Sequence, residues 1–293
     1  MNRTRGVAAT LAAVTLWGSA FTGIAIALEG FRPASLTLAR FGLASAALAA
    51  AGVVAGVGLP ARAHWPRLLW VSLCGITAYH VMLNFGMTRV PPTVTALLIQ
   101  TSPIFTALLA RTLLGERLPA LAWAGILLAA GGASLLILSK SEGGTAMGAH
   151  GLLILGCAVV TSLYFVGQQP LSARYGSFAV TVWSFVVGSA PLLVFTPALA
   201  EDLASAPTSA WLAVLYIGLL PAALAYGLWN YGLRELGPTQ ASVFLYFSPV
   251  VAVASEAVLL GTTPGPLAWV GGGTALVGVI LVQRARAQKR PST

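Results

Sequence analysis

Apolar residues follow one another along this chain in long runs instead of alternating with polar residues. Short turns rich in proline, glycine or charge, such as Glu29–Pro33, separate the runs. A helix needs roughly 20 apolar residues to cross the hydrocarbon core, and it bonds all its backbone polar groups internally. The pattern predicts ten membrane-spanning helices, at 6–28, 34–56, 66–87, 92–114, 119–138, 149–170, 176–197, 209–232, 238–260 and 265–283.

The composition agrees with a lipid environment. Of the 293 residues, 57% are hydrophobic and only 8% are charged, whereas a soluble domain carries about 25% charged residues. The first run follows Arg3 and Arg5, as a signal peptide would, but it is long for one and nine more runs follow, so we expect a retained helix. The expected fold class is an all-α integral membrane protein.

Basic residues predict the orientation of the helices. Cytoplasmic loops of membrane proteins collect Lys and Arg. With ten spans and a cytoplasmic N-terminus, three basic residues fall in outer loops and Arg40 falls within a span. The charges are dispersed over alternate loops, so the net charge of +9 indicates topology and not a nucleic-acid partner. Both termini are predicted to be cytoplasmic, and the predicted inner set is Arg3, Arg5, Arg62, Arg67, Arg111, Arg117, Arg174, Arg234, Arg284, Arg286, Lys289 and Arg290.

The chain contains an internal repeat. Shifting the sequence by 146 positions aligns polar and structural residues without a gap. We expect residues 1–140 and 147–288 to form two five-helix units, followed by a cytoplasmic tail at 289–293. The matches include Trp65 with Trp211, Asn84 with Asn230, Pro92 with Pro238, Ser102-Pro103 with Ser248-Pro249, Gly125 with Gly271, and Gly132 with Gly278.

An odd number of helices in each unit places the two units upside down relative to each other. Inverted repeats are a recurring plan of secondary transporters, because exchanging the conformations of the halves exposes a midplane site to each side in turn. Some inverted repeats form channels instead. The repeat therefore favours transport by alternating access and leaves a pore as the alternative.

Short motifs in the first unit resemble the EamA repeat of the drug/metabolite transporter superfamily. The resemblance implies that helices 1–4 and 6–9 surround a central cavity, with helices 5 and 10 peripheral, in a bacterial-type inner membrane. Members of that family export amino acids, including aromatic ones, other metabolites and toxic compounds. The second unit departs from the pattern at Thr262 and at Thr161–Tyr164. The motifs are Trp17-Gly18-Ser19, Arg40, Ser102-Pro103 and Gly115-Glu116-Arg117-Leu118.

Polar side chains within the spans predict a substrate site. Such side chains are costly in hydrocarbon and usually face the bundle interior or a wet cavity. His80 and Asn84 are four residues apart and share a helix face, as do two other pairs. We interpret the set as a mostly apolar pocket with a few hydrogen-bonding groups; plain interhelical hydrogen bonding is the alternative for each residue. The candidates are Trp17, Tyr79, His80, Asn84, Gln100, Tyr164, Gln168, Tyr226, Asn230 and Tyr246.

Two further features suggest moving parts. Ser102-Pro103 and Ser248-Pro249 lie near the middle of helices 4 and 9, where proline kinks a helix; each kink is a hinge or a purely architectural bend. Arg40 and Glu256 lie at similar predicted depth near the outer side. We hypothesise an ion pair that closes this side, against the alternative that both side chains snorkel to the interface.

The sequence lacks the residues that several other classes of protein require. The sequence has no phosphate-binding Gly-Lys-Ser/Thr loop and no metal-spaced His/Cys cluster, and its only aspartate is Asp202. Cys74 and Cys157 fall inside apolar runs and form no motif. We expect no cofactor and no metal, and keep an integral-membrane enzyme as the alternative from a different class.

Without a carboxylate near the midplane, a neutral or zwitterionic substrate fits best, with amino acids first and broad drug efflux as the alternative. The expected partners are this small molecule and the bilayer; the sequence leaves the oligomeric state open, with a monomer possible.

Overall fold

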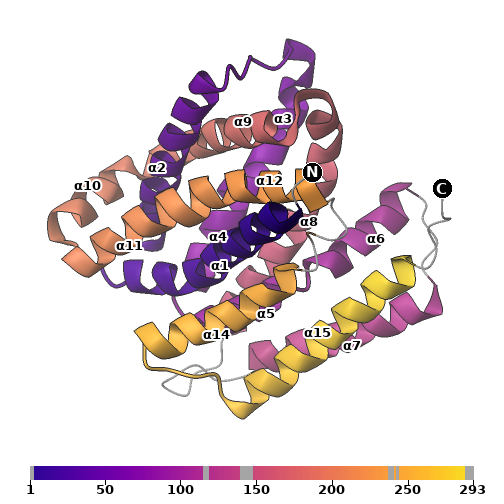
Figure 1. Ribbon diagram of the computed structural model, residues 1–293. Coiled ribbons are helices and arrows are strands. Elements are labelled where there is room, and N and C mark those ends of the chain that lie inside the picture. Colours follow the sequence, from indigo (N-terminus) through magenta and orange to yellow (C-terminus); the bar gives the residue numbers. More distant parts are fainter. Residues whose placement is uncertain (1–2, 115–118, 139–147, 237–240, 242–243, 288–293) are drawn as a thin grey trace.

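The computed structural model describes residues 3–114, 119–138, 148–236, 241 and 244–287. The chain forms a bundle of helices (Figure 1). In the first half they are α1 (Arg3–Ala27), α2 (Pro33–Val54), η1 (Arg62–His64), α3 (Trp65–Ser72), η2 (Leu73–Ala78), α4 (Tyr79–Gly86), α5 (Pro92–Ile99), α6 (Ser102–Leu114) and α7 (Ala120–Leu138). In the second half they are α8 (Gly148–Tyr175), α9 (Ser177–Ser189), η3 (Ala190–Phe195), α10 (Thr196–Ser205), α11 (Thr208–Leu219), η4 (Leu220–Leu224), α12 (Ala225–Leu236), η5 (Leu245–Phe247), α14 (Ser248–Leu259) and α15 (Pro266–Ala287).

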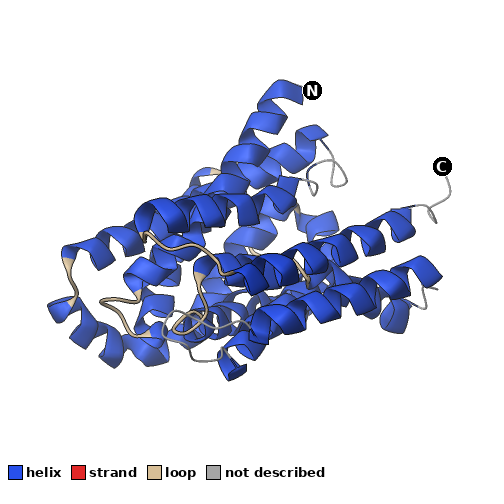
Figure 2. Ribbon diagram, turned by 90° about the horizontal axis from the view of Figure 1, so that it is seen from below, coloured by secondary structure: helices blue, strands red, loops and turns tan. Residues whose placement is uncertain are grey.

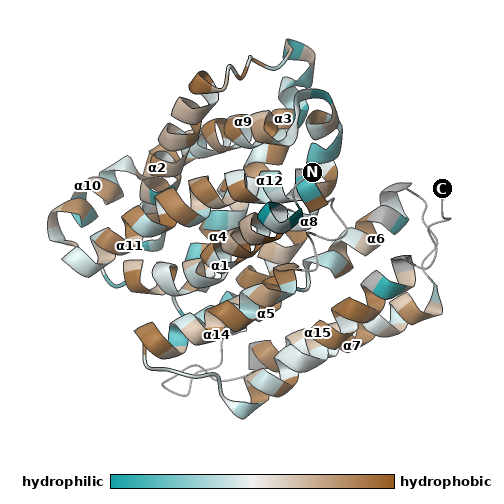
Figure 3. Ribbon diagram, viewed as in Figure 1, coloured by the Kyte–Doolittle hydropathy of each residue, from teal (hydrophilic) through white to brown (hydrophobic). Residues whose placement is uncertain are grey.

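These helices account for the ten predicted spans. Seven helical stretches within the described residues are long and apolar enough to cross a membrane, and three shorter apolar helices follow the same pattern. Figure 2 shows helices and connecting loops without a sheet in the described part, and Figure 3 shows hydrophobic residues along nearly every helix. The predicted all-α membrane fold is confirmed. The motif at 115–118, the unit boundaries at 140, 147 and 288, and the tail at 289–293 lie outside the described residues.

The internal repeat extends to irregularities of the backbone. The third span of each unit contains a π-helical segment, η2 in the first half and η4 in the second, at nearly equivalent positions under the 146-residue shift. The predicted breaks at the Ser-Pro pairs are also present, because α6 and α14 each begin at the serine. Two copies of one sequence thus repeat the same departures from a regular α-helix.

Reciprocal contacts between α2 and α9 show that the two units are inverted. The Ser45 hydroxyl donates to the carbonyl oxygen of Phe185 at 3.0 Å, and the Ser189 hydroxyl donates to that of Phe41 at 3.2 Å. The two hydroxyls are 2.7 Å apart. Because the earlier residue of each helix meets the later residue of the other, the equivalent helices run antiparallel.

The peripheral helices α7 and α15 repeat this arrangement at even closer range (Figures 1 and 2). A Cβ added to Gly125 would lie 2.7 Å from the carbonyl oxygen of Gly278, and one added to Gly271 would lie 2.9 Å from that of Gly132. Small residues allow such close backbone packing in membranes. Four glycines of these two helices, at 125, 132, 271 and 278, therefore pack within the molecule.

The remaining helices of each unit pack against helices of the other unit, around the centre of the molecule. Helix α1 packs on α12 and α14 of the other half, and its counterpart α8 packs on α4 and α6. Helices α2 and α11 pack together, as do their counterparts α9 and α3. Each unit therefore supplies walls to a shared interior, while α7 and α15 pair at the edge.

Candidate functional site

A central cavity of about 350 Å³ lies between the two units. Helices α1, α2, α4, α8, α9 and α12 contribute to its walls, together with both helix breaks. None of the described residues of α7 and α15 lines it, as the family resemblance implied. The lining residues are Trp17, Ala20, Phe21, Ile24, Arg40, Phe41, Gly75, Tyr79, His80, Leu83, Ile99, Gln100, Ser102, Thr161, Tyr164, Phe165, Gln168, Gln169, Ser172, Ser177, Thr181, Pro221, Ala222, Tyr226, Trp229, Asn230, Leu245 and Ser248.

The structure brings most of the predicted substrate residues to this cavity. Eight of the ten line it, from four helices and from one helix break: Trp17, Tyr79, His80, Gln100, Tyr164, Gln168, Tyr226 and Asn230. Among the residues predicted to act as hinges or gates, Arg40, Ser102 and Ser248 line the cavity, whereas Pro103, Pro249 and Glu256 do not.

Asn84 and Tyr246 lie outside the cavity. The Asn84 amide is fully buried and donates to the Thr37 hydroxyl of α2 at 2.8 Å. His80 of α4 stacks on Phe41, which also belongs to α2, with ring centroids 3.9 Å apart. His80 and Asn84 therefore share a face, as their spacing predicted, but the cavity ends between them. Tyr246 packs against the apolar cluster beside α7 and α15.

The two π-helical segments position the lining residues that follow them. A π-turn adds a residue to one turn of a helix, rotates the next turn, and is frequent at functional sites. Tyr79 and His80 come directly after η2, and Tyr226 comes two residues after η4. A Cβ at Gly75 would overlap the ring of Tyr164, so this glycine in the π-turn also makes room for a second aromatic wall.

Aromatic side chains form much of the wall. Trp17 of α1 lies between Tyr226 and Trp229 of α12, with ring centroids at 5.4 and 5.2 Å. The Trp17 indole N–H donates to the carbonyl oxygen of Pro221 at 3.0 Å. That acceptor belongs to η4, so the irregular helix also fixes the tryptophan.

The two helix breaks touch each other at the cavity. The Gln100 side chain in the first break donates to the carbonyl oxygen of Leu245 in the second, at 2.8 Å. The Ser162 hydroxyl of α8 donates to the carbonyl oxygen of Ser102 at 2.7 Å. Each break thus accepts a side-chain hydrogen bond from the other half of the chain.

The ion pair between Arg40 and Glu256 is not present, because each side chain has separate surroundings. Glu256 accepts the backbone N–H of Thr93 at 2.7 Å and the Thr262 hydroxyl at 3.2 Å, so it caps the N-terminus of α5. Arg40 faces the cavity instead. Both side chains are buried, at 5% exposure for Arg40 and 3% for Glu256, so neither snorkels to the interface.

A second buried carboxylate links the α1–α2 loop to α10. The backbone N–H and Nε of Arg32 donate to Asp202 of α10 at 2.8 and 2.9 Å, and the Ser35 hydroxyl also contacts this carboxylate. Arg32 further pairs with Glu201 at 2.8 Å. The sequence carries no pattern for this network, since its partners are 170 residues apart.

The cavity opens at the opposite end. Lining residues near the α8–α9 turn, Gln169 and Ser177, are exposed, whereas Ile24 and Leu83 at the other end are almost fully buried. The polar residues Thr161, Gln169, Ser172 and Thr181 were not predicted to line the site. Three carry hydroxyl groups, which apolar runs tolerate and which therefore give little signal.

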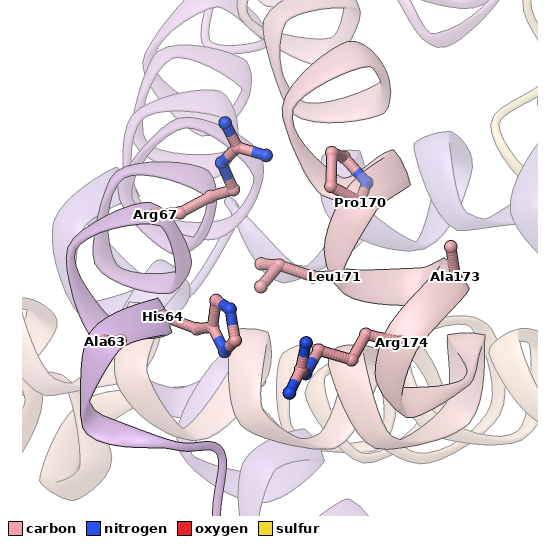
Figure 4. Close-up of a pocket in the computed structure, with 7 residues that line it drawn as sticks. All are labelled: Ala63, His64, Arg67, Pro170, Leu171, Ala173 and Arg174. Atoms are coloured by element: carbon pink, nitrogen blue, oxygen red, sulfur yellow. The ribbon is translucent and has the colours of Figure 1, made fainter.

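A separate open pocket of about 560 Å³ lies between η1–α3 and the end of α8 (Figure 4). His64, Arg67 and Arg174 line it, and His64 Nδ1 lies 2.7 Å from the Tyr175 hydroxyl. Both arginines are exposed and belong to the predicted cytoplasmic loops. The pocket lacks the enclosed aromatic walls of the central cavity, which remains the candidate site.

Known proteins match the chain over nearly its full length. A family model described as the EamA-like transporter family matches residues 4–138 and 150–284. A probable terminal-alkyne amino-acid exporter of Streptantibioticus cattleyicolor is 35% identical over 99% of this chain and 97% of its own. The aromatic amino acid exporter YddG of Ancylobacter novellus is 28% identical over 97% and 100%. One solved crystal structure, 25% identical, covers 97% of this chain and 100% of its own, with a TM-score of 0.65.

Proposed function

Because the chain belongs to the EamA-like transporter family, we propose that it carries small zwitterionic metabolites, with amino acids first, across the membrane by alternating access. The family consists of transporters, so the alternative of an integral-membrane enzyme is set aside. Two relatives are described as amino-acid exporters, which supports this substrate class.

One observation carries the proposal. The central cavity has aromatic walls from both units, and no carboxylate side chain lies among its lining residues. A volume of about 350 Å³ is at the lower end of the range for small-molecule sites. A carrier for organic cations would be expected to place an acidic group there. The cavity therefore favours a compact substrate without net positive charge over broad cationic drugs.

Alternating access follows from the inverted repeat. The cavity opens near the α8–α9 turn and is closed near the α1–α2 loop. If the two units exchanged conformations, the open and closed ends would exchange as well. Both helix breaks lie between these ends, and we propose that Ser102-Pro103 and Ser248-Pro249 act as the hinges.

The orientation is also part of the proposal. The excess of basic residues in alternate loops supports an inner-membrane protein with both termini in the cytoplasm. The cavity would then open to the cytoplasm, where an exporter loads its substrate. Residues 1–140 and 147–288 would be the two units, with 289–293 as a tail.

Counterflow in proteoliposomes tests the carrier. Vesicles preloaded with unlabelled phenylalanine or leucine should take up the labelled amino acid faster than empty vesicles. A channel would show no acceleration by preloading, and this outcome would contradict alternating access. Acceleration by an organic cation but by no amino acid would favour broad drug efflux.

Proton coupling is expected to be weak, because no carboxylate faces the cavity among the described residues. An imposed pH gradient should leave the amino-acid counterflow nearly unchanged. Strong accumulation driven by the gradient, and unaffected by His80→Gln, would contradict this expectation.

A further inference from the structure

Arg40 is a buried cation without a counter-ion among the described residues. It is 5% exposed, and its Nε and Nη1 atoms have no hydrogen-bond partner in the described structure. Among the acidic residues that the structure describes, Asp202 and Glu201 bind Arg32, and Glu256 accepts the N–H of Thr93. Glu29 is exposed in the α1–α2 loop. Burying an unpaired charge costs several kcal/mol, so an arginine that persists there is expected to meet a partner in the working cycle.

The surroundings of Arg40 point its charge toward the cavity. Its guanidinium carbon lies 5.1 Å from the centroid of the Phe41 ring, and Tyr79 and Tyr226 line the same cavity. All four residues line the cavity. The positive charge therefore stands beside the space that a substrate would occupy.

The other unpartnered groups in the cavity can also donate hydrogen bonds. Asn230 Nδ2 on α12 and His80 Nδ1 on α4 are buried and have no partner in the described structure. Asn230 Nδ2 is a donor, and His80 Nδ1 is one in the appropriate tautomer or when protonated. Donors from α2, α4 and α12 thus face the cavity without an acceptor in the described structure, and the lining residues supply no anion.

A guanidinium presents a planar set of N–H donors that matches a carboxylate in geometry and charge. We propose, on the basis of the transport function above, that Arg40 is the carboxylate-binding residue of the substrate site. The amino group of the substrate meets aromatic faces but no acidic side chain. The carrier therefore selects compact monocarboxylates with an apolar or aromatic side chain, and an amino group is not required.

Matched competitors test this selection on the wild-type protein. Counterflow of labelled phenylalanine is measured in the presence of three unlabelled competitors: phenylalanine, phenylpyruvate and phenethylamine. Phenylpyruvate lacks the amino group, and phenethylamine lacks the carboxylate. The corresponding leucine series (leucine, 4-methyl-2-oxopentanoate and isoamylamine) repeats the measurement. We expect the oxo acids to compete within about tenfold of the amino acids and the amines to compete at least about 100-fold more weakly, the loss typical of an unpaired buried charge.

Substitution of Arg40 assigns the selection to this residue. Arg40→Gln keeps much of the side-chain length and removes the charge, and Arg89→Gln, at an exposed loop position, is the matched control. In each series, Arg40→Gln should raise the half-saturating concentration of the amino acid and of the oxo acid about 100-fold. Competition by the amine should be unchanged or stronger. Arg40→Lys should restore part of the preference for acids. A purely structural role would weaken all competitors equally or lower the yield of folded protein in size-exclusion chromatography.

The outcomes separate this inference from the proposed function. If no member of either series gives counterflow, the amino-acid carrier proposal fails and the inference fails with it. If counterflow occurs but the amines compete as well as the amino acids, the function stands and the role of Arg40 is overturned. An unchanged acid-to-amine ratio in folded Arg40→Gln would overturn it as well.

Discussion

At the scale of single residues, Gly75 shows how little free space surrounds the site. Gly75 lies within the π-helical segment η2, and a Cβ at this position would overlap the ring of Tyr164. Gly75→Ala should therefore push the ring toward the cavity, reduce transport severalfold, and cost about 1–3 kcal/mol in stability, as overpacking does.

The measurement is the initial counterflow rate together with the midpoint of thermal unfolding. Gly42→Ala in α2 is the control, because nothing lies within 4 Å of a Cβ added there. Both values should stay close to wild type for the control. A Gly75→Ala protein with wild-type transport and stability would show that Tyr164 is free to move.

At the scale of helices, the two Ser-Pro breaks are where motion is expected. Pro103 and Pro249 each remove a backbone donor at the start of α6 and α14, which separates these helices from the segments before them. The double substitution Pro103→Ala/Pro249→Ala would allow more regular helices and should slow counterflow about tenfold or more while the protein stays folded. Pro66→Ala, at the start of α3, should leave the rate unchanged. Wild-type rates in the folded double variant would assign the breaks an architectural role.

The helices also show what sequence patterns can and cannot predict. Ten spans, the repeat, the two breaks and eight cavity residues follow from apolar runs, a fixed shift of 146 positions, and polar side chains within lipid. The π-turns have no comparable pattern, since the proline within η4 has no counterpart in η2. Helical spacing predicts which face a residue lies on, but it does not predict how far the cavity extends along the helix. Asn84 therefore shares a face with His80 and still lies beyond the cavity.

Pairing of charges proved harder to predict than their burial. Arg40 and Glu256 have similar predicted depth, but depth does not say which way a side chain points. Glu256 turns to the backbone of Thr93, where a helix N-terminus favours a carboxylate. Asp202, which belongs to no pattern in the sequence, links two distant segments through Arg32.

At the scale of the whole molecule, this Asp202 network should hold one end of the cavity closed. Asp202→Asn keeps the size of the side chain and weakens its bonds to Arg32 and Ser35. Ile24, deep in the cavity, should then become more accessible from that end. In a Cys74→Ala/Cys157→Ala background, Ile24→Cys should react severalfold faster with a membrane-impermeant maleimide when Asp202→Asn is added.

Glu29→Gln is the matched control, since Glu29 is exposed in the same loop region and makes no ion pair among those found in the described structure. Its labelling rate should equal that of the parent. Equal labelling in the Asp202→Asn protein would mean that other contacts close this end.

The glycine contacts between α7 and α15 have a consequence for biosynthesis. Since the backbones of the two halves approach closely at two points along this helix pair, recognition between the halves does not depend on the peptide that joins them. Two separately translated polypeptides, residues 1–140 and 141–293, should find each other in the membrane and co-purify through a tag on either one. Gly132→Leu in the first polypeptide should prevent capture of the second. A gene for one half could thus have served an ancestor whose product inserted in both directions.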